Sequence, residues 1–202
     1  LAGMGGASTP ELAAAVSNAG GLGVLGAAGC SPRRLREWIA RTRQLTDRPF
    51  GVDTLLPASV RRNETATRNG RTPADLLPEY QRFAREFMER EQLAVPDRDA
   101  LAREAGIDPD ERGPMVFSKE FFEAQMEVVV DEKVPVYAAG LGNPEPWLDR
   151  LHANGTKVIA VVGQVRHARQ VAASGVDVIV AQGHDGGGHN APVGTLALIP
   201  QV

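Results

Sequence analysis

The sequence predicts an α/β protein in which short parallel strands alternate with helices. Strand-like apolar runs begin near residues 22, 49, 134, 157 and 176, and helix-start signals separate them. Several of these runs lack polar alternation, which is typical of strands buried on both faces of a parallel sheet. With a partial strand at residues 1–4, six strand-like segments result. Both a (β/α) barrel, which has eight strands, and an open doubly wound sheet fit this pattern.

The first third of the chain contains two helix–strand units. In Thr9-Pro10-Glu11, Thr9 can cap a helix, Pro10 suits its first position, and Glu11 favours its positive end. Gly20-Gly21 ends this helix, and an apolar strand over 22–26 follows. Ser31-Pro32 repeats the start signal before a second helix, and residues 49–56 are predicted to form the next strand.

Residues 58 to about 115 interrupt the alternation with a segment rich in Arg, Glu, Asp and Pro. Thr72-Pro73 is predicted to start a helix, and a shorter one is expected over 97–105. The first of these helices carries an apolar stripe made of Leu76, Leu77, Tyr80, Phe83, Phe87 and Met88. We interpret 58–115 as a mostly helical insertion after the third strand of a single domain, 1–202. A lid over the active site is one hypothesis for it.

Regular alternation returns after the insertion. The predicted order is a helix over 118–130, a strand over 134–139, a helix over 144–153, a strand over 157–162, a helix over 164–174 and a strand over 176–181. Two strands of an eight-stranded barrel are then unaccounted for. Because the chain also begins without Met, we expect it to be incomplete.

Composition excludes several classes of function. The 25 acidic and 22 basic residues give a net charge of -3, so no nucleic-acid partner is expected. The single cysteine, Cys30, excludes an internal disulfide framework and a multi-cysteine zinc site. No apolar run has the length of a membrane span, and no secretion leader opens the chain. We therefore expect a cytoplasmic protein without a membrane partner.

The most informative segment follows the last predicted strand, at 181–190. Gly186-Gly187-Gly188 lets the backbone approach a ligand closely, and His189 comes directly after it. An imidazole beside a ligand suits a general base. A flexible loop with solvated histidines would have the same sequence pattern and is the alternative. His184, Asp185 and His189 do not have the spacing of a known metal site, so no metal is expected.

Two further candidates lie near the amino terminus. The segment Ala2-Gly3-Met4-Gly5-Gly6-Ala7-Ser8 connects the first predicted strand with the first helix, and its glycines free the backbone for a planar or phosphorylated ligand. The alternative is a tight strand-to-helix turn. Asp53 is a polar residue inside the apolar strand over 49–56. Because a buried carboxylate needs partners, Asp53 is either functional or a satisfied strand-end residue.

Together these segments resemble the nitronate monooxygenase family, also called 2-nitropropane dioxygenase-like flavoproteins. The resemblance is carried by residues 2–6, by the string from Glu11 to Gly23, by residues 48–52 and by residues 177–189. It implies a TIM barrel that binds FMN without a covalent link. It also implies His189 as the base or substrate-orienting group beside the flavin. The cofactor-binding positions that follow from it are Ala2, Gly3, Met4, Asp53, Gln182, Gly187 and Gly188.

The chain departs from the family pattern at several of these positions. Gly3 stands where the family commonly has Pro, Asp53 where it usually has Asn, and Asp185-Gly186 where it has Glu-Ala. A negative charge at Asp53 would disfavour an anionic reduced flavin. The family's last two strands carry the loops that hold the FMN phosphate, and these are not found in the chain.

The resemblance implies FMN-dependent oxidation of alkyl nitronates or nitroalkanes with O₂, giving a carbonyl compound and nitrite. An FMN-dependent enoyl-ACP reductase using NAD(P)H is an alternative, because it shares the Gly-Gly-His pattern. A truncated, non-catalytic chain without the FMN phosphate site is a second alternative. The expected partners are a small-molecule nitronate and O₂, with a homodimer left open.

Overall fold

The computed structural model describes residues 1–56, 73–94 and 119–202 of the 202-residue chain. The chain divides into two compact units, one made of Leu1–Ser59 with Ser118–Val202 and the other of Val60–Phe117. The described part of the predicted insertion falls in the second unit, and each unit is described by itself. Whether 58–115 is an insertion within one domain stays a prediction.

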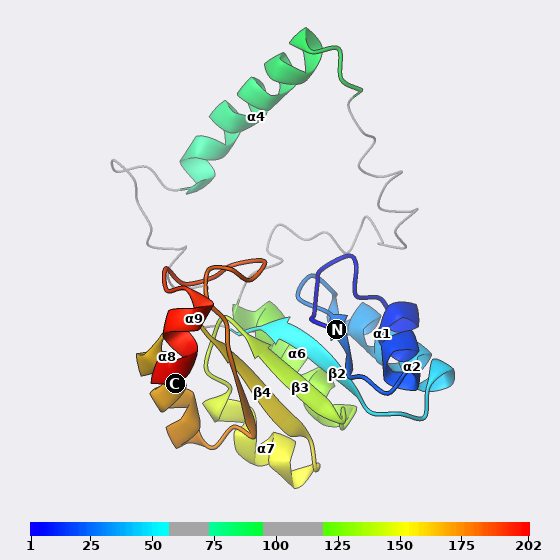
Figure 1. The fold of residues 1–202 in the computed structure, drawn as a ribbon. Helices are drawn as coiled ribbons and strands as arrows, with labels where there is room; N and C mark the ends of the chain where they lie inside the picture. Colours follow the sequence, from blue (N-terminus) through cyan, green and yellow to red (C-terminus); the bar gives the residue numbers. More distant parts are fainter. Residues whose placement is uncertain (57–72, 95–118) are drawn as a thin grey trace. The chain divides into compact units, whose positions relative to one another are not determined.

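The first unit is built on a five-stranded parallel sheet with the order β1-β2-β3-β4-β5 (Figure 1). Its strands are β1 (Gly23–Gly26), β2 (Phe50–Leu55), β3 (Val136–Gly140), β4 (Lys157–Val162) and β5 (Val178–Ala181). Each strand pairs in parallel with the next one along the chain. This sequential order is that of a (β/α)8-type barrel, whereas a doubly wound sheet reverses its order at a switch point. In the described residues the sheet is open, with β1 and β5 at its edges.

Residues 1–4, predicted as a partial strand, form no strand in the structure. The amino group of Leu1 donates to the carbonyl of Leu22 at 2.9 Å, but the chain then turns away. The hydroxyl of Ser8 accepts from the N–H of Met4 at 3.0 Å and donates to the carbonyl of Ala2 at 2.8 Å. Because the buried Ser8 binds these backbone groups, they do not enter a strand ladder, and the described sheet has five strands.

Helices connect the strands at the predicted places. They are α1 (Pro10–Asn18), α2 (Pro32–Leu45), α6 (Lys119–Asp131), α7 (Leu148–Ala153) after the 3-10 turn η3 (Glu145–Trp147), and α8 (Val165–Ser174). The short α9 (Thr195–Leu198) and the 3-10 turn η4 (Ile199–Gln201) follow β5. Ser31 caps α2 as predicted, since its Oγ accepts from the N–H of Arg34 at 3.1 Å. Thr9 precedes α1 without a side-chain cap bond.

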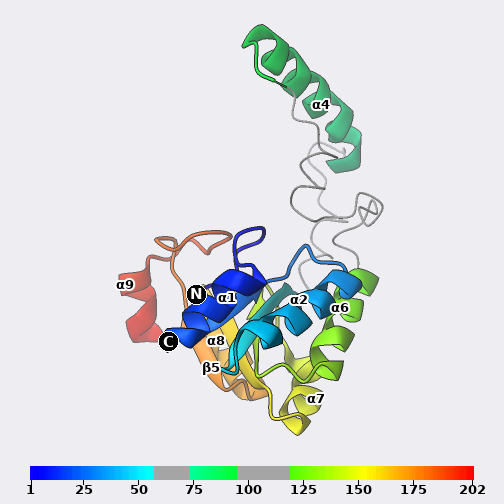
Figure 2. The ribbon, with the colours of Figure 1, turned by 90° about the vertical axis from the view of Figure 1, so that its right-hand side faces the viewer.

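The two faces of the sheet differ in burial. The face covered by helices carries the core, which includes Leu25, Val52, Tyr137, Ala139, Val158 and Ala160. On the other face Val161, Val178 and Val180 are exposed. The prediction that the strands are buried on both faces therefore holds for β1 but is wrong for β4 and β5. Parallel connections cross over with one hand, so sequentially ordered strands place their helices on one face, where α1, α2 and α6 lie side by side (Figure 2).

In the second unit the structure describes α4 (Pro73–Arg90) and the turn after it. The predicted helix start at Pro73 is confirmed. The described side chains of the apolar stripe are largely exposed, with Tyr80 at 63% and Phe83 at 65%. The rings of Phe83 and Phe87 stack with centroids 6.4 Å apart. The other predictions for the insertion, including the helix at 97–105, lie outside the described residues. None of the helices in the described part of the chain combines the length and the apolar character that spanning a bilayer requires.

The amino-terminal edge of the sheet is held by a paired carboxylate, Asp177, just before β5. Its Oδ1 accepts from Nζ of Lys157 at 2.7 Å, and its Oδ2 accepts from the N–H of Val158 at 2.9 Å. His152 Nε2 lies 3.0 Å from the same Oδ2. Burial by itself would raise the pKa of Asp177, but these hydrogen bonds outweigh it and lower the pKa to about 2.

We expect Asp177→Asn to lower the free energy of unfolding at pH 7 by about 1–2 kcal/mol, because charged hydrogen bonds at a strand junction are lost. The folded-state pKa is lowered, so this stabilisation is fully present above the unfolded value of about 4 and is lost as the pH falls through about 2. Urea unfolding curves measured between pH 7 and about pH 3 would show the gap to wild type narrowing. Asp149→Asn, on the exposed start of α7, is the control and should change stability little. A gap that does not depend on pH would contradict the account.

Candidate functional site

The amino-terminal turn packs onto the carboxyl end of β1. The N–H of Gly26, the last residue of β1, donates to the carbonyl of Ser8 at 3.0 Å. A Cβ built on Gly26 would overlap the backbone of Met4. Glycine is therefore required at this position by the close approach of two backbones. As a result residues 2–8 are fixed over the strand ends.

Asp53 lies near the carboxyl end of β2, between two glycines. A Cβ built on Gly3 would overlap the side chain of Asp53, and one built on Gly140, at the end of β3, would lie 3.2 Å from its Oδ1. Burial raises the pKa of Asp53 to about 7. Within the described segments no hydrogen bond or ion pair reaches either carboxyl oxygen. The alternative that Asp53 is a strand-end residue with satisfied hydrogen bonds is therefore not supported by these residues.

The loop after β5 is closed by its own side chains. Nε2 of Gln182 donates to the carbonyl of Gly187 at 2.8 Å. Nδ2 of Asn190 donates to the carbonyls of Gly186 at 2.8 Å and His184 at 3.1 Å. Asp185 accepts from the N–H of Thr195 at 2.7 Å, at the start of α9, which lowers the pKa of Asp185. The glycine-rich loop is thus an organised turn anchored to α9.

The structure places all the predicted site residues at one edge of the sheet. The turn at residues 2–8 and the loop after β5 both lie at the edge where the strands end, as both views show (Figures 1 and 2). Of the predicted residues, Gly3 and Asp53 are in direct contact. His189, Gly187 and Gly188 are exposed, and no contact in the described residues joins them to Asp53. Their role beside a ligand, like that of Ala2, Met4 and Gln182, stays a prediction.

Two residues that shape this edge were not predicted. Gly140 borders the carboxyl group of Asp53, and Ser8 holds the amino-terminal turn through its buried hydroxyl. The sequence offered one signal for Gly140: it is a glycine at the end of a predicted strand, next to the strand that carries Asp53. Ser8 belonged to the candidate segment over 2–8 and to a helix start, but its hydrogen bonds to the backbone of the turn were not predicted.

The edge fits a flat ligand better than a metal ion. Around Gly5 and Gly187 no atom lies within 4 Å of a built Cβ, so the backbone there is accessible. The carboxyl group of Asp53, beside Gly3, offers one polar contact to a ligand at this edge. In the segments that the structure describes, no three His, Cys, Asp or Glu side chains gather as a metal site would require. A planar ring laid against glycine backbone meets these conditions.

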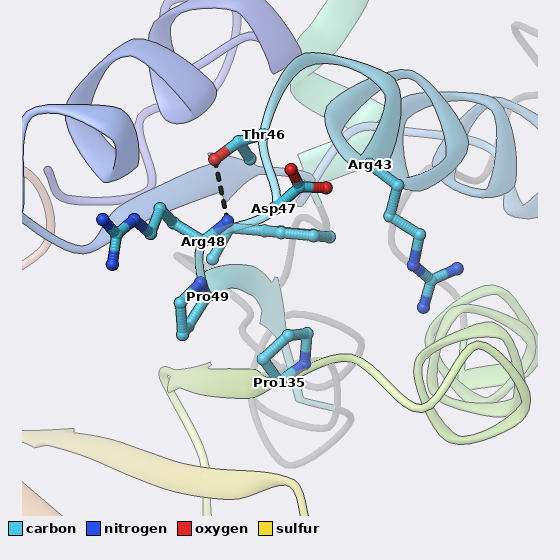
Figure 3. A pocket seen from close by; sticks show the side chains of 7 residues that line it. Arg43, Thr46, Asp47, Arg48, Pro49 and Pro135 are labelled. Atoms are coloured by element: carbon cyan, nitrogen blue, oxygen red, sulfur yellow. Dashed lines mark hydrogen bonds between the residues drawn. The ribbon is translucent and has the colours of Figure 1, made fainter.

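A separate hollow of about 340 Å³ lies at the opposite, amino-terminal edge (Figure 3). It is lined by Arg43, Thr46, Asp47, Arg48, Pro49, Phe50 and Pro135. The N–H of Arg48 donates to Oγ1 of Thr46 at 3.0 Å, and Arg43 is bound to Glu132 at 2.7 Å. Residues at this edge of a (β/α) fold serve stability, whereas sites lie at the carboxyl ends of the strands.

Comparisons with known proteins show which family the chain resembles along its whole length. The profile of the nitronate monooxygenase family matches residues 1–202. A Mycobacterium tuberculosis protein named "Putative monooxygenase Rv1533" is 36% identical over 196 residues, which are 95% of this chain and 50% of that protein. The structure of nitroalkane oxidase from Streptomyces ansochromogenes is similar with a TM-score of 0.72 and 28% identity, over 99% of this chain and 53% of its own. The structure of FabK from Thermotoga maritima is similar with a TM-score of 0.66 and 31% identity, over 100% of this chain and 47% of its own.

The chain spans about half the length of the curated relatives it matches. The family match nevertheless covers every residue of the chain, including the amino-terminal turn and the loop after β5. It confirms the resemblance that the sequence motifs indicated. The chain belongs to the nitronate monooxygenase family, a family of flavin-dependent oxidoreductases.

Proposed function

We propose that the protein uses FMN and O₂ to oxidise alkyl nitronates or nitroalkanes to a carbonyl compound and nitrite. The observation that carries the proposal is the carboxyl group of Asp53 beside Gly3, which no described residue pairs, at the carboxyl edge of a parallel sheet in a member of this family. The likeness to nitroalkane oxidase at 28% identity supports the substrate class. Because the chain spans about half of its relatives, the activity is proposed for the whole protein.

The residues of this chain have separate tasks in the proposal. FMN supplies the redox chemistry when bound. The backbone at Gly5 and Gly6, which no other atom crowds, and the carboxyl group of Asp53 would hold the ring. The hydrogen bond from Gln182 to Gly187 holds the loop in shape, so that His189 can remove the α-proton of a nitroalkane or orient a nitronate. The exposure of His189 leaves its imidazole available for this task.

A cytoplasmic location belongs to the same proposal, with a small-molecule nitronate and O₂ as the partners. A homodimer is the first oligomeric state to test, by light scattering on the purified protein.

His189→Ala should lower kcat for ethyl nitronate by about a hundredfold, because a positioned general base contributes about that much or more. Oxygen uptake with FMN, ethyl nitronate and air measures the rate, and absorbance near 450 nm measures bound flavin, which should stay near the wild-type level. His167→Ala, on α8, is the matched control and should leave both values unchanged. Equal loss of flavin and rate would assign His189 to cofactor binding. If the wild-type holoenzyme consumed no oxygen with any nitronate, the proposed reaction would be wrong.

Gly3→Val should weaken FMN binding by tenfold or more, about 1.4 kcal/mol, since its side chain would overlap that of Asp53 and displace the turn. The dissociation constant is measured by quenching of flavin fluorescence. Gly29→Ala adds a methyl group where no atom lies within 4 Å, and it should bind like wild type. Circular dichroism melting of both variants separates a displaced turn from an unfolded chain. Unchanged FMN affinity in a folded Gly3→Val protein would contradict the placement of the ring.

NAD(P)H-dependent reduction of an enoyl thioester is a second candidate function. The likeness to FabK at 31% identity supports this candidate. Anaerobic mixing of the holoenzyme with NAD(P)H distinguishes the two reactions. Rapid bleaching near 450 nm followed by turnover of an enoyl thioester supports the reductase, whereas oxygen uptake with a nitronate supports the oxidation. A colourless protein without affinity for FMN supports the non-catalytic alternative.

A further inference from the structure

We propose that Asp53 acts as a hydrogen-bond donor to the ring ligand, so that the site binds this ligand when Asp53 is protonated and releases it when Asp53 ionises. The inference rests on the proposed function, because the ring is taken to be a flavin. It goes beyond that function by assigning the protonation state of one contact and a pH dependence of cofactor affinity.

The carboxyl group of Asp53 lies between two glycines. Asp53 is partly buried at the carboxyl end of β2, with Gly3 against its side chain and Gly140 next to Oδ1. Neither glycine has a side chain that could pair with it. A carboxyl group withdrawn from water needs a partner or must lose its charge. In the part of the chain that the structure describes it has no partner, so a bound ligand is the natural source of one.

The neighbours of Asp53 across the sheet are uncharged. On its face of the sheet, the register places Gly26, Ala138, Ile159 and Val178 in the same row, and none of them is charged. Burial alone accounts for the raised pKa of Asp53, about 7. At neutral pH a substantial fraction of Asp53 is therefore protonated and carries an O–H that can donate.

The charged and titratable groups near this edge have other partners or are exposed; the amino group of Leu1, for example, donates to the carbonyl of Leu22 at 2.9 Å. The hydroxyl of Tyr137 in β3 interacts electrostatically with Asp53, but it lies 3.0 Å from Oγ1 of Thr54 in the core and its pKa is raised, so it stays neutral. Residues 2–8 and β1 contain no charged side chain. In the loop after β5, Asp185 is held by the N–H of Thr195 and by His184, 3.1 Å away, while His189 is exposed. No cation in these elements is placed to keep Asp53 ionised.

An asparagine amide donates a hydrogen bond at every pH, whereas a carboxyl group donates only when protonated. Once ionised, Asp53 would present an acceptor and a negative charge to the ligand atom that accepts its O–H in this proposal. Asp53→Asn keeps the size of the side chain and its ability to donate, so it is the variant that separates protonation from the contact itself.

The experiment is a pH series of FMN affinity, measured by fluorescence quenching on the folded protein from pH 5.5 to 9. For wild type we expect a nearly constant dissociation constant below about pH 7 and roughly a tenfold rise per pH unit above it. Asp53→Asn should bind FMN with a nearly flat profile, and Asp53→Ala with a flat profile and lower affinity. Riboflavin is titrated in parallel, because it has no phosphate whose own ionisation could bend the curve.

The outcomes separate this inference from the proposed function. Tight FMN binding by wild type with the same pH profile as Asp53→Asn overturns the inference and leaves the proposed cofactor intact. Wild-type affinity that increases with pH also overturns it. Absence of FMN and riboflavin binding in wild type and in a folded Asp53→Asn protein overturns the proposed cofactor and this inference together.

Discussion

The close packing of the amino-terminal turn on the strand ends is the constraint on which the candidate site depends. The backbone of Met4 lies where a side chain on Gly26 would be, and Gly3 lies against Asp53. The hydroxyl of Ser8 holds the turn in this position. Without these contacts residues 2–6 could add a strand to the sheet or move freely, and the carboxyl group of Asp53 would be open to water.

Two aspartates show how differently the two edges of the sheet are used. Asp177, at the amino-terminal edge, binds a lysine, a backbone N–H and a histidine, and its pKa falls. Asp53, at the carboxyl edge, is surrounded by glycine and apolar residues, and its pKa rises. The first arrangement stabilises the ionised group and the fold. The second is costly for the ionised group and is typical of functional positions.

Two facts bear on the activity of this chain. Val161, Val178 and Val180 of β4 and β5 are exposed. The chain spans about half of the curated relatives it matches. Predictions of activity are therefore made for the whole protein, while the packing of the turn, the loop after β5 and Asp53 are properties of this chain.

The sequence by itself determined the alternation of strands and helices, the helix starts at Pro10 and Pro32, and the family, because these depend on local signals and on motifs of consecutive residues. It also identified Asp53 as unusual, since one carboxylate in an apolar run is visible without a structure. Only the tertiary structure decided that the carboxyl group of Asp53 has no partner among the described residues, that Gly3 and Gly140 border it, and that one face of β4 and β5 is exposed. These facts depend on contacts between residues far apart in the chain, such as Gly3, Asp53 and Gly140, which no local pattern encodes.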